Sequence, residues 1–424
     1  MTEPNATPGE LQAHFFRHEA GRIVVALTRI FGVHNLALAE DVAQDAFCRA
    51  LEVWRLRGLP DNPGAWLMTT AKNRALDIVR RERTARTFAP ELGRLLDTEW
   101  TLAPVIDEAF APGTIRDEQL RMMFSCCQPH LPEEVQIALV LNVLCGFGAH
   151  EIANAFLTGL AAIEKRISRG KKALASSPRL FDLGDAEFAE RLATVQRALY
   201  LLFNEGYHGA SAETPARAEL CEEAIRLTAL LRAYPPAATP ATHALAALMC
   251  LHAARLPARI DPAGDLSALA DQDRVRWDAR LVADGLALLE QCAAGEQLTA
   301  YHVEAAIAAV HASARATADT DWTAIVALYE RLMVVAPSPV VALSRAIAIG
   351  QRDGAEHGLA ALHAIGDAER LASYPFYPAA FGELELERGD RDAARQHFRA
   401  ALGLARNEAE RRFLQNRIER CNDE

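Results

Sequence analysis

The sequence has few glycines and prolines, no closely paired cysteines and no long apolar run. Only 24 Gly and 20 Pro occur in 424 residues, half of them hydrophobic, which excludes collagen-like and disordered classes and predicts about three packed domains. The eight Cys never form a C-x-x-C pair, so we expect buried, reduced thiols rather than disulfides. Because no stretch approaches roughly 20 apolar residues and the start of the chain is polar, we expect a cytoplasmic protein without a membrane partner.

Catalytic patterns are also missing. The 13 His are dispersed, and neither an H-E-x-x-H spacing nor a comparable acid/base or metal-ligand cluster occurs. We therefore predict a protein that is not an enzyme, with no catalytic residues, no cofactor and no metal.

The charge is distributed unevenly. Residues 1–180 hold 21 basic and 21 acidic side chains, whereas residues 181–424 hold 24 and 35, so the whole net charge of −11 lies in the second part. All four lysines lie in the neutral first part, inside two basic clusters. This pattern predicts that only the first part binds a polyanion.

Strand signals are nearly absent, because Ala and Leu dominate and apolar residues are spaced by three and four. The fold class is therefore all-α. Near the end, Arg352-Asp353 recurs 39 positions later as Arg391-Asp392, each preceded by a glycine (Gly350, Gly389), which favours tetratricopeptide-like helix pairs. Composition shifts predict four segments: a helical domain at 11–86, a linker at 87–115, a second helical domain at 116–178 and a helical extension at 185–424.

Two helices are predicted in the first segment. Apolar residues between Ala39 and Trp54 follow a strict 3,1,3,1 rhythm that leaves a polar face opposite. A loop with one Gly and two Pro follows, and Pro63 suits the first turn of the next helix. Six basic residues lie between Lys72 and Arg86, which fits phosphate contact, although cations at a helix end also favour the helix dipole.

The second basic cluster follows a helix-turn-helix pattern. A helix over Glu133–Leu144 is broken by glycines; a short helix covers Ala149–Phe156; and an amphipathic helix covers Leu160–Leu174. In this layout the last helix enters the DNA major groove. An ordinary αα-hairpin is the plain alternative.

These elements together resemble an RNA polymerase sigma factor of the extracytoplasmic-function (ECF) group in the sigma-70 family. The resemblance covers residues 11–175. It rests on Ala39-Glu-Asp-Val-Ala-Gln-Asp-Ala-Phe47, on Trp66-Leu with Lys72-Asn73, and on Glu151-Ile-Ala leading into Lys165-Arg166. The acidic remainder resembles the tetratricopeptide-like extension of one subgroup.

The resemblance implies two partners, core RNA polymerase and promoter DNA, and three sets of contact residues. The face that docks on the polymerase clamp comprises Asp41, Gln44, Asp45 and Arg49. The set that melts and reads the −10 element comprises Trp66, Lys72, Asn73, Asp77, Arg80 and Arg81. The set for the −35 element comprises Leu160, Glu164, Lys165, Arg166, Arg169 and Lys172, with its cations on phosphates and Glu164 able to accept from a cytosine amine.

One compact polar-aromatic segment remains, Phe203-Asn-Glu-Gly-Tyr207. Its plain interpretation is a helix end closed by Gly206 with the tyrosine packed beneath. Its functional interpretation is an interdomain contact made by Asn204, Glu205 and Tyr207. The acidic extension is expected to bind a protein regulator rather than nucleic acid.

Two rival functions use the same elements. A stand-alone helix-turn-helix transcription regulator with a protein-binding helical domain explains the second basic cluster, but has no use for the polar face around Asp41 or for the Trp66 helix. A helical scaffold that binds only protein explains neither basic cluster. Binding to core polymerase separates the sigma factor from both rivals.

Overall fold

The computed structural model describes residues 8–81, 112–128, 130–155, 158–176, 185–208, 218–261, 265–292 and 297–422. These residues form helices and connecting turns, and their one β-type pairing is an isolated bridge between Ile260 and Leu266. The predicted all-α class is confirmed. The chain divides into two compact units, Met1–Leu199 and Tyr200–Glu424, which are described separately.

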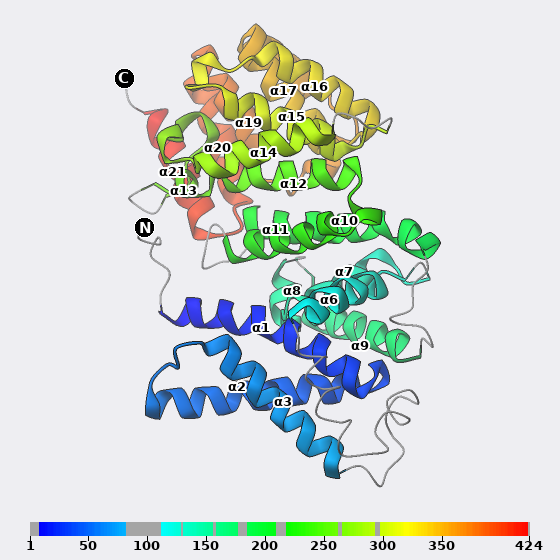
Figure 1. Cartoon of the computed structure of the whole chain (residues 1–424). Helices are drawn as coiled ribbons and strands as arrows, with labels where there is room; N and C mark the ends of the chain where they lie inside the picture. Colours follow the sequence, from blue (N-terminus) through cyan, green and yellow to red (C-terminus); the bar gives the residue numbers. More distant parts are fainter. Residues whose placement is uncertain are drawn as a thin grey trace. The chain divides into compact units, whose positions relative to one another are not determined.

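Unit 1 contains the helices predicted for the first 180 residues (Figure 1). The predicted linker 87–115 lies outside the described residues up to 111, and a helix begins inside it at Pro112. The elements are α1 (Pro8–Phe31), η1 (Val33–Asn35), α2 (Leu36–Arg57), α3 (Pro63–Arg81), α6 (Pro112–Cys126), α7 (Glu133–Leu139), the π-helical turn η3 (Val140–Leu144), α8 (Ala149–Ala155), α9 (Leu160–Ser176) and the first part of α10 (Asp185–His208).

Helix α1 is the centre of unit 1, since it packs against α2, α3, α6 and η3. At Gly21 the approach to η3 is so close that an added Cβ would lie 2.0 Å from the carbonyl oxygen of Leu144. Ion pairs join the same segments: Arg29 contacts Glu118, and Lys171 lies 2.6 Å from Glu40. The first three helices of unit 1 are therefore joined to α6 and α9 by packing and by ion pairs.

The first part of α10 belongs to unit 1, although the extension was predicted to begin at residue 185. The Phe188 ring lies 4.1 Å from that of Phe124, and Arg191 donates a hydrogen bond to the Phe124 carbonyl at 3.2 Å. Because these contacts hold the start of α10, the division between the units falls inside the helix, after Leu199.

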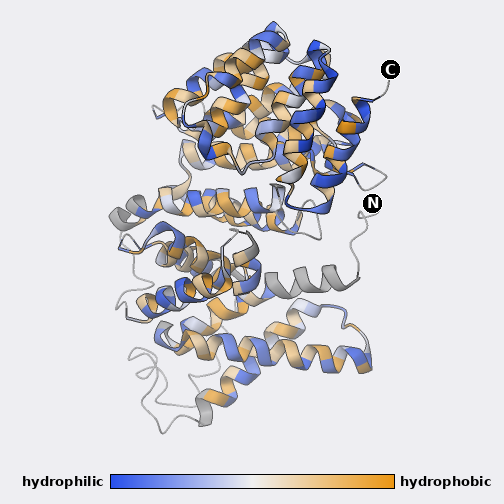
Figure 2. Ribbon diagram, turned by 180° about the vertical axis from the view of Figure 1, so that it is seen from behind, coloured by the Kyte–Doolittle hydropathy of each residue, from blue (hydrophilic) through white to orange (hydrophobic). Residues whose placement is uncertain are grey.

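Unit 2 is a succession of helices in which neighbours in sequence pack on each other; Figure 1 labels α14 to α17, α19 and α20 among them. The helices next to the C-terminus are mostly hydrophilic (Figure 2). The elements after α10 are α11 (Ala218–Ala233), η4 (Pro235–Ala237), α12 (Pro240–Ala253), α13 (Leu256–Arg259), η5 (Leu269–Asp271), η6 (Arg274–Arg276), α14 (Ala279–Cys292), α15 (Ala300–Ser313), η7 (Thr317–Asp319), α16 (Trp322–Val335), α17 (Pro339–Asp353), α18 (Ala355–His363), η8 (Ala368–Leu371), α19 (Phe376–Arg388), α20 (Arg391–Gly403) and α21 (Glu408–Arg420).

The repeat predicted near the end is real as a succession of helix pairs, but its register differs. Helix α17 begins at 339 and α19 at 376, while α18 begins at 355 and α20 at 391, so the structural period is about 36 residues rather than 39. The turns carry Gly354 and Gly389, with φ of 96° and 93°. Gly350 instead lies inside α17, where its missing side chain admits Gly358 and Leu384.

Candidate functional site

Helix α2 has the two faces that its sequence predicts. The small and apolar residues Ala39, Val42, Ala43, Ala46 and Ala50 are buried. The predicted polymerase-docking residues Asp41, Gln44, Asp45 and Arg49 are all exposed. Asp41 has no hydrogen bond or ion pair within the described part of the chain, which leaves its carboxylate available to a partner. Asp45 accepts a hydrogen bond from Nε of Arg74 at 3.3 Å.

A groove of about 900 Å³ lies between α2 and α3. It brings together residues from two of the predicted sets, because Asp45 and Arg49 line it with Trp66, Asn73 and Asp77. The Trp66 ring packs edge-on against that of Trp54 at 5.5 Å. Lys72 is not part of the lining, and the side chains of Arg80 and Arg81 lie outside the described residues. The further lining residues are Ala46, Pro60, Asn62, Ala65, Thr69, Thr70 and Arg74.

The geometry of α3 follows from its first turn. The Asn62 side chain accepts from the Ala65 amide at 3.0 Å, which satisfies one of the free amides at a helix start, and Pro63 is tolerated there because it has none. The helix then places Trp66, Asn73 and Asp77 along one face. Arg74 was missed in the sequence analysis, although its eight-residue spacing from Trp66 puts it on the same side.

Two large apolar side chains are exposed where α2 ends and the loop to α3 begins. Gly58, with φ of 81°, ends α2, and Leu56 and Leu59 on either side are 85% and 74% exposed. Contact between an exposed leucine and another apolar surface is favourable, because it removes apolar area from water. Unstacked bases present such a surface. The groove therefore combines an aromatic wall with hydrogen-bonding groups, and two exposed leucines lie in the chain segment just before its lining residue Pro60.

The predicted helix-turn-helix is present as α7, α8 and α9. The Gly148 amide donates to Glu151 at 2.9 Å and begins α8. Gly170 allows α9 to pack tightly on α7, since an added Cβ would lie 2.5 Å from the Leu139 side chain. This packing fixes the direction of α9 within unit 1.

Helix α9 buries Ile163, Ile167 and Leu174 and presents a basic face to solvent. Lys165, Arg169 and Lys172 are exposed and form no ion pair with any described residue. Arg166 pairs with Glu134 instead, so it is less available than predicted. The predicted −35 residues that are exposed are Leu160, Glu164, Lys165, Arg169 and Lys172.

The segment predicted to make an interdomain contact lies in unit 2. Helix α10 continues to His208, so it does not end at Gly206. Tyr207 is buried, with the Arg259 guanidinium 4.3 Å from its ring centre. Asn204 lines a cavity of unit 2, and Glu205 is partly exposed.

The remaining observations concern the cysteines, possible metal-ligand groups and possible membrane spans. Seven of the eight cysteines are buried and none is in a disulfide; burial raises the pKa of Cys126 to about 12, which keeps it a thiol. Within the described ranges, no group of three or more His, Cys, Asp or Glu side chains could hold a metal ion. None of the helices described here is both long enough and apolar enough to cross a bilayer.

Comparison with known proteins agrees with the resemblance to an ECF sigma factor. Residues 15–85 match the family Sigma-70 region 2, and residues 191–293 match a family of unknown function, DUF6596. An uncharacterized protein of Rhizobium meliloti is 40% identical over 93% of this chain and 92% of its own length. The ECF RNA polymerase sigma factor SigK of Mycolicibacterium vanbaalenii is 27% identical over 39% of this chain and 80% of its own length. No solved structure matches the chain.

The region 2 match and the likeness to SigK identify a transcription protein of the sigma-70 family. Within that family, the chain belongs to the ECF sigma factors and carries a helical C-terminal extension.

Proposed function

We propose that this protein binds core RNA polymerase and directs it to promoters that have −10 and −35 elements. The observation that carries the proposal is the groove between α2 and α3, in a segment that matches sigma-70 region 2. The polymerase supplies the chemistry of RNA synthesis, so the chain itself acts as a binding and DNA-opening subunit.

The polymerase contact is assigned to the exposed face of α2. Asp41 and Gln44 lie outside the groove and have no bond to another described side chain, which makes them the best candidates for docking. Asp45 and Arg49 line the groove as well, so their roles are shared between polymerase docking and the shape of the DNA site.

Opening of the −10 element is assigned to the groove and to the exposed leucines Leu56 and Leu59. Extruding a base costs a few kcal/mol of stacking, which the pocket must offset. Trp66 offers an aromatic surface, Asn73 offers both a donor and an acceptor, and Leu56 and Leu59 can contact the neighbouring base.

Recognition of the −35 element is assigned to α9. Lys165, Arg169 and Lys172 form an exposed cationic face that suits contact with the phosphates on both sides of the DNA major groove. Leu160 and Glu164 lie at the N-terminal end of the helix, where base edges are read in helix-turn-helix proteins.

Unit 2 is proposed as a regulatory module that binds a protein rather than DNA. Residues 200–424 hold 31 acidic and 22 basic side chains, a net charge of −9, which repels phosphates. Successive helix pairs of this kind form extended protein-binding surfaces.

The proposal is tested by combining the full chain with core polymerase and measuring promoter-selected run-off transcription. We expect the chain to copurify with core polymerase and to produce transcripts that share −10 and −35 sequences. Specific DNA binding without polymerase binding would favour the stand-alone regulator, and the absence of both would favour the scaffold.

The role of unit 2 is tested by truncation after Leu199, because the contacts of Phe188 and Arg191 require the start of α10 to stay with unit 1. Polymerase binding and transcript yield are then measured separately. A truncated chain that matches the full chain in both would show that unit 2 has no regulatory role.

A further inference from the structure

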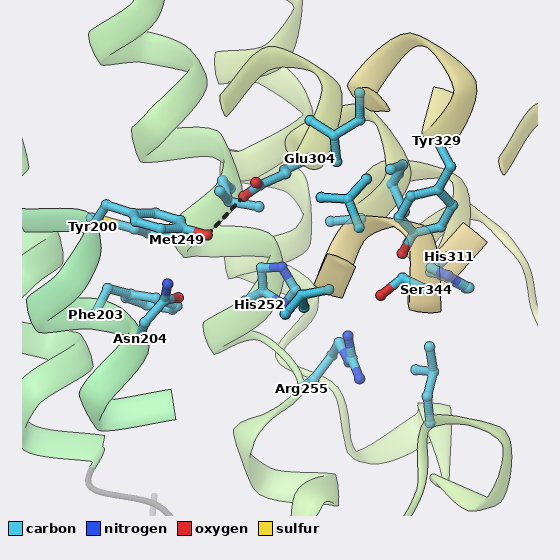
Figure 3. A pocket seen from close by; sticks show the side chains of 17 residues that line it. Tyr200, Phe203, Asn204, Met249, His252, Arg255, Glu304, His311, Tyr329 and Ser344 are labelled. Atoms are coloured by element: carbon cyan, nitrogen blue, oxygen red, sulfur yellow. Dashed lines mark hydrogen bonds between the residues drawn. The ribbon is translucent and has the colours of Figure 1, made fainter. Parts of the chain in front are cut away.

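A cavity of about 270 Å³ lies inside unit 2, lined by residues between 200 and 344 (Figure 3). Most of its wall is apolar and comes from α12, α15, α16 and α17. Eight of the 17 lining residues have polar side chains: Tyr200, Asn204, His252, Arg255, Glu304, His311, Tyr329 and Ser344. Small-molecule sites combine apolar walls with convergent polar groups, and this cavity has both, with a volume just below that of drug-sized pockets.

Arg255 brings a positive charge into this cavity without a negative partner. Its Nε donates to Gln272 at 3.4 Å, and its guanidinium lies 5.9 and 5.6 Å from the ring centres of Tyr207 and Trp277. No carboxylate of a described residue pairs with it. Burial, with further repulsion from nearby arginines, lowers the pKa of Arg255, so its surroundings disfavour the positive charge.

His311, which lines the same cavity, has a buried ring nitrogen without a hydrogen-bond partner among the described residues. Its side chain is only 8% exposed, and its Nδ1 has no hydrogen-bond partner in the described structure. A buried polar atom without a partner is rare in folded proteins, and an unfilled ligand site is one reason for it. Arg274, which lies nearby, is already occupied, because it donates to the Ala314 carbonyl at 2.7 Å.

The opposite side of the cavity accepts hydrogen bonds. Tyr200 donates to a carboxylate oxygen of Glu304 at 3.1 Å, and this pair lies across the open space from Arg255 (Figure 3). Glu304 can accept a further bond from a hydroxyl group. The cavity therefore has a cationic end, an apolar middle and an acceptor end.

We propose that this cavity binds a small organic anion, with an oxyanion head on Arg255 and His311 and an apolar or aromatic body between α12, α15 and α17. A guanidinium suits either carboxylate or phosphate, because its parallel N–H groups match both. A hydroxyl at the far end of the ligand would bond Glu304. The inference does not depend on sigma activity, and it gives unit 2 a small-molecule site in addition to its proposed protein-binding surface.

The test is isothermal titration calorimetry on the full chain with three single-ring probes. The carboxylate is 4-hydroxybenzoate, the phosphate is phenyl phosphate, and 4-hydroxybenzamide is the uncharged control. We expect at least one anion to bind with one-to-one stoichiometry and the amide to bind at least tenfold more weakly, because a charge-assisted contact contributes about a factor of ten or more. Whichever anion binds identifies the head group.

Three variants assign the binding to the cavity. R255M keeps the bulk of the side chain and removes its charge, so the affinity for the anion should fall at least tenfold. R255K keeps the charge and should retain part of the affinity, which a purely structural role of Arg255 does not predict. R280M removes an exposed charge on α14 and should bind as the native chain does.

Circular dichroism and the unfolding temperature of each variant confirm that it is folded. The proposal is overturned if neither anion binds the native chain, if the amide binds as tightly as the anions, or if folded R255M binds the anion as tightly as the native chain.

Discussion

His311 is one of the two buried histidines of α15. Burial, and then the positive charges of Arg255 and Arg274, lower its pKa from 6.5 to about 4. The folded protein therefore holds a neutral ring, whereas the unfolded chain binds a proton as the pH falls below 6.5. Stability contributed by the neutral ring is complete above the unfolded pKa and is lost between 6.5 and about 4.

The size of the effect follows from the two pKa values. Loss of the whole contribution of the neutral ring lowers the free energy of unfolding by about 3 kcal/mol. About 2 kcal/mol of this is lost between neutral pH and about pH 5. His311→Gln removes the titrating ring. The free energy of unfolding of the native chain should thus fall about 2 kcal/mol more than that of the variant over this range.

Urea unfolding at the two pH values measures this difference, and a nuclear magnetic resonance titration of the histidine rings measures the pKa directly. The matched control is His357→Gln, which removes an exposed histidine on α18. A His311 ring that titrates near its ordinary value would refute the reasoning. The same conclusion would follow from equal pH dependence in the native chain and the His311 variant.

Three further outcomes are expected. Replacing Lys165 and Arg169 by Ala should lower the slope of promoter affinity against salt by about 2, measured by filter binding, because two phosphate contacts are lost. Trp66→Ala should reduce permanganate reactivity of the −10 element without loss of polymerase binding, whereas Trp66→Phe should retain most of it. Arg417→Met should lower the free energy of unfolding by about 2 kcal/mol, because it leaves Glu383, 2.8 Å away, without its cation; an unchanged urea midpoint would contradict this.

The sequence predicted α2, α3, α8 and α9 well, because each depends on local spacing, whereas α1 and α6 were not predicted individually. The 3,1,3,1 rhythm of α2, the proline at the start of α3 and the glycines before α8 are all short-range signals, and the structure has helices at these places. The exposed side of α2 follows directly, since burying one face of a helix leaves the other in solvent.

Features made by distant residues were not predictable in the same way. The cavity of unit 2 is lined by residues from Tyr200 to Ser344, so no short pattern indicates it. The pairing of Arg166 with Glu134 depends on how α9 lies on α7. The repeat register was misplaced because the Arg-Asp pairs fall at a helix end in one case and at a helix start in the other.

The central claim is that this chain docks on core RNA polymerase through α2. The most direct test is the dissociation constant of the full chain and core polymerase, measured for the native protein and for two single charge reversals. Asp41→Lys changes the exposed face of α2, and Asp284→Lys makes the same change on an exposed position of α14 in unit 2. The account predicts tight polymerase binding by the native chain and by Asp284→Lys. Folded Asp41→Lys should bind at least tenfold more weakly, because its lysine would be repelled by the polymerase surface that binds the Asp41 carboxylate. Equal binding by all three, or no binding by the native chain, would contradict it.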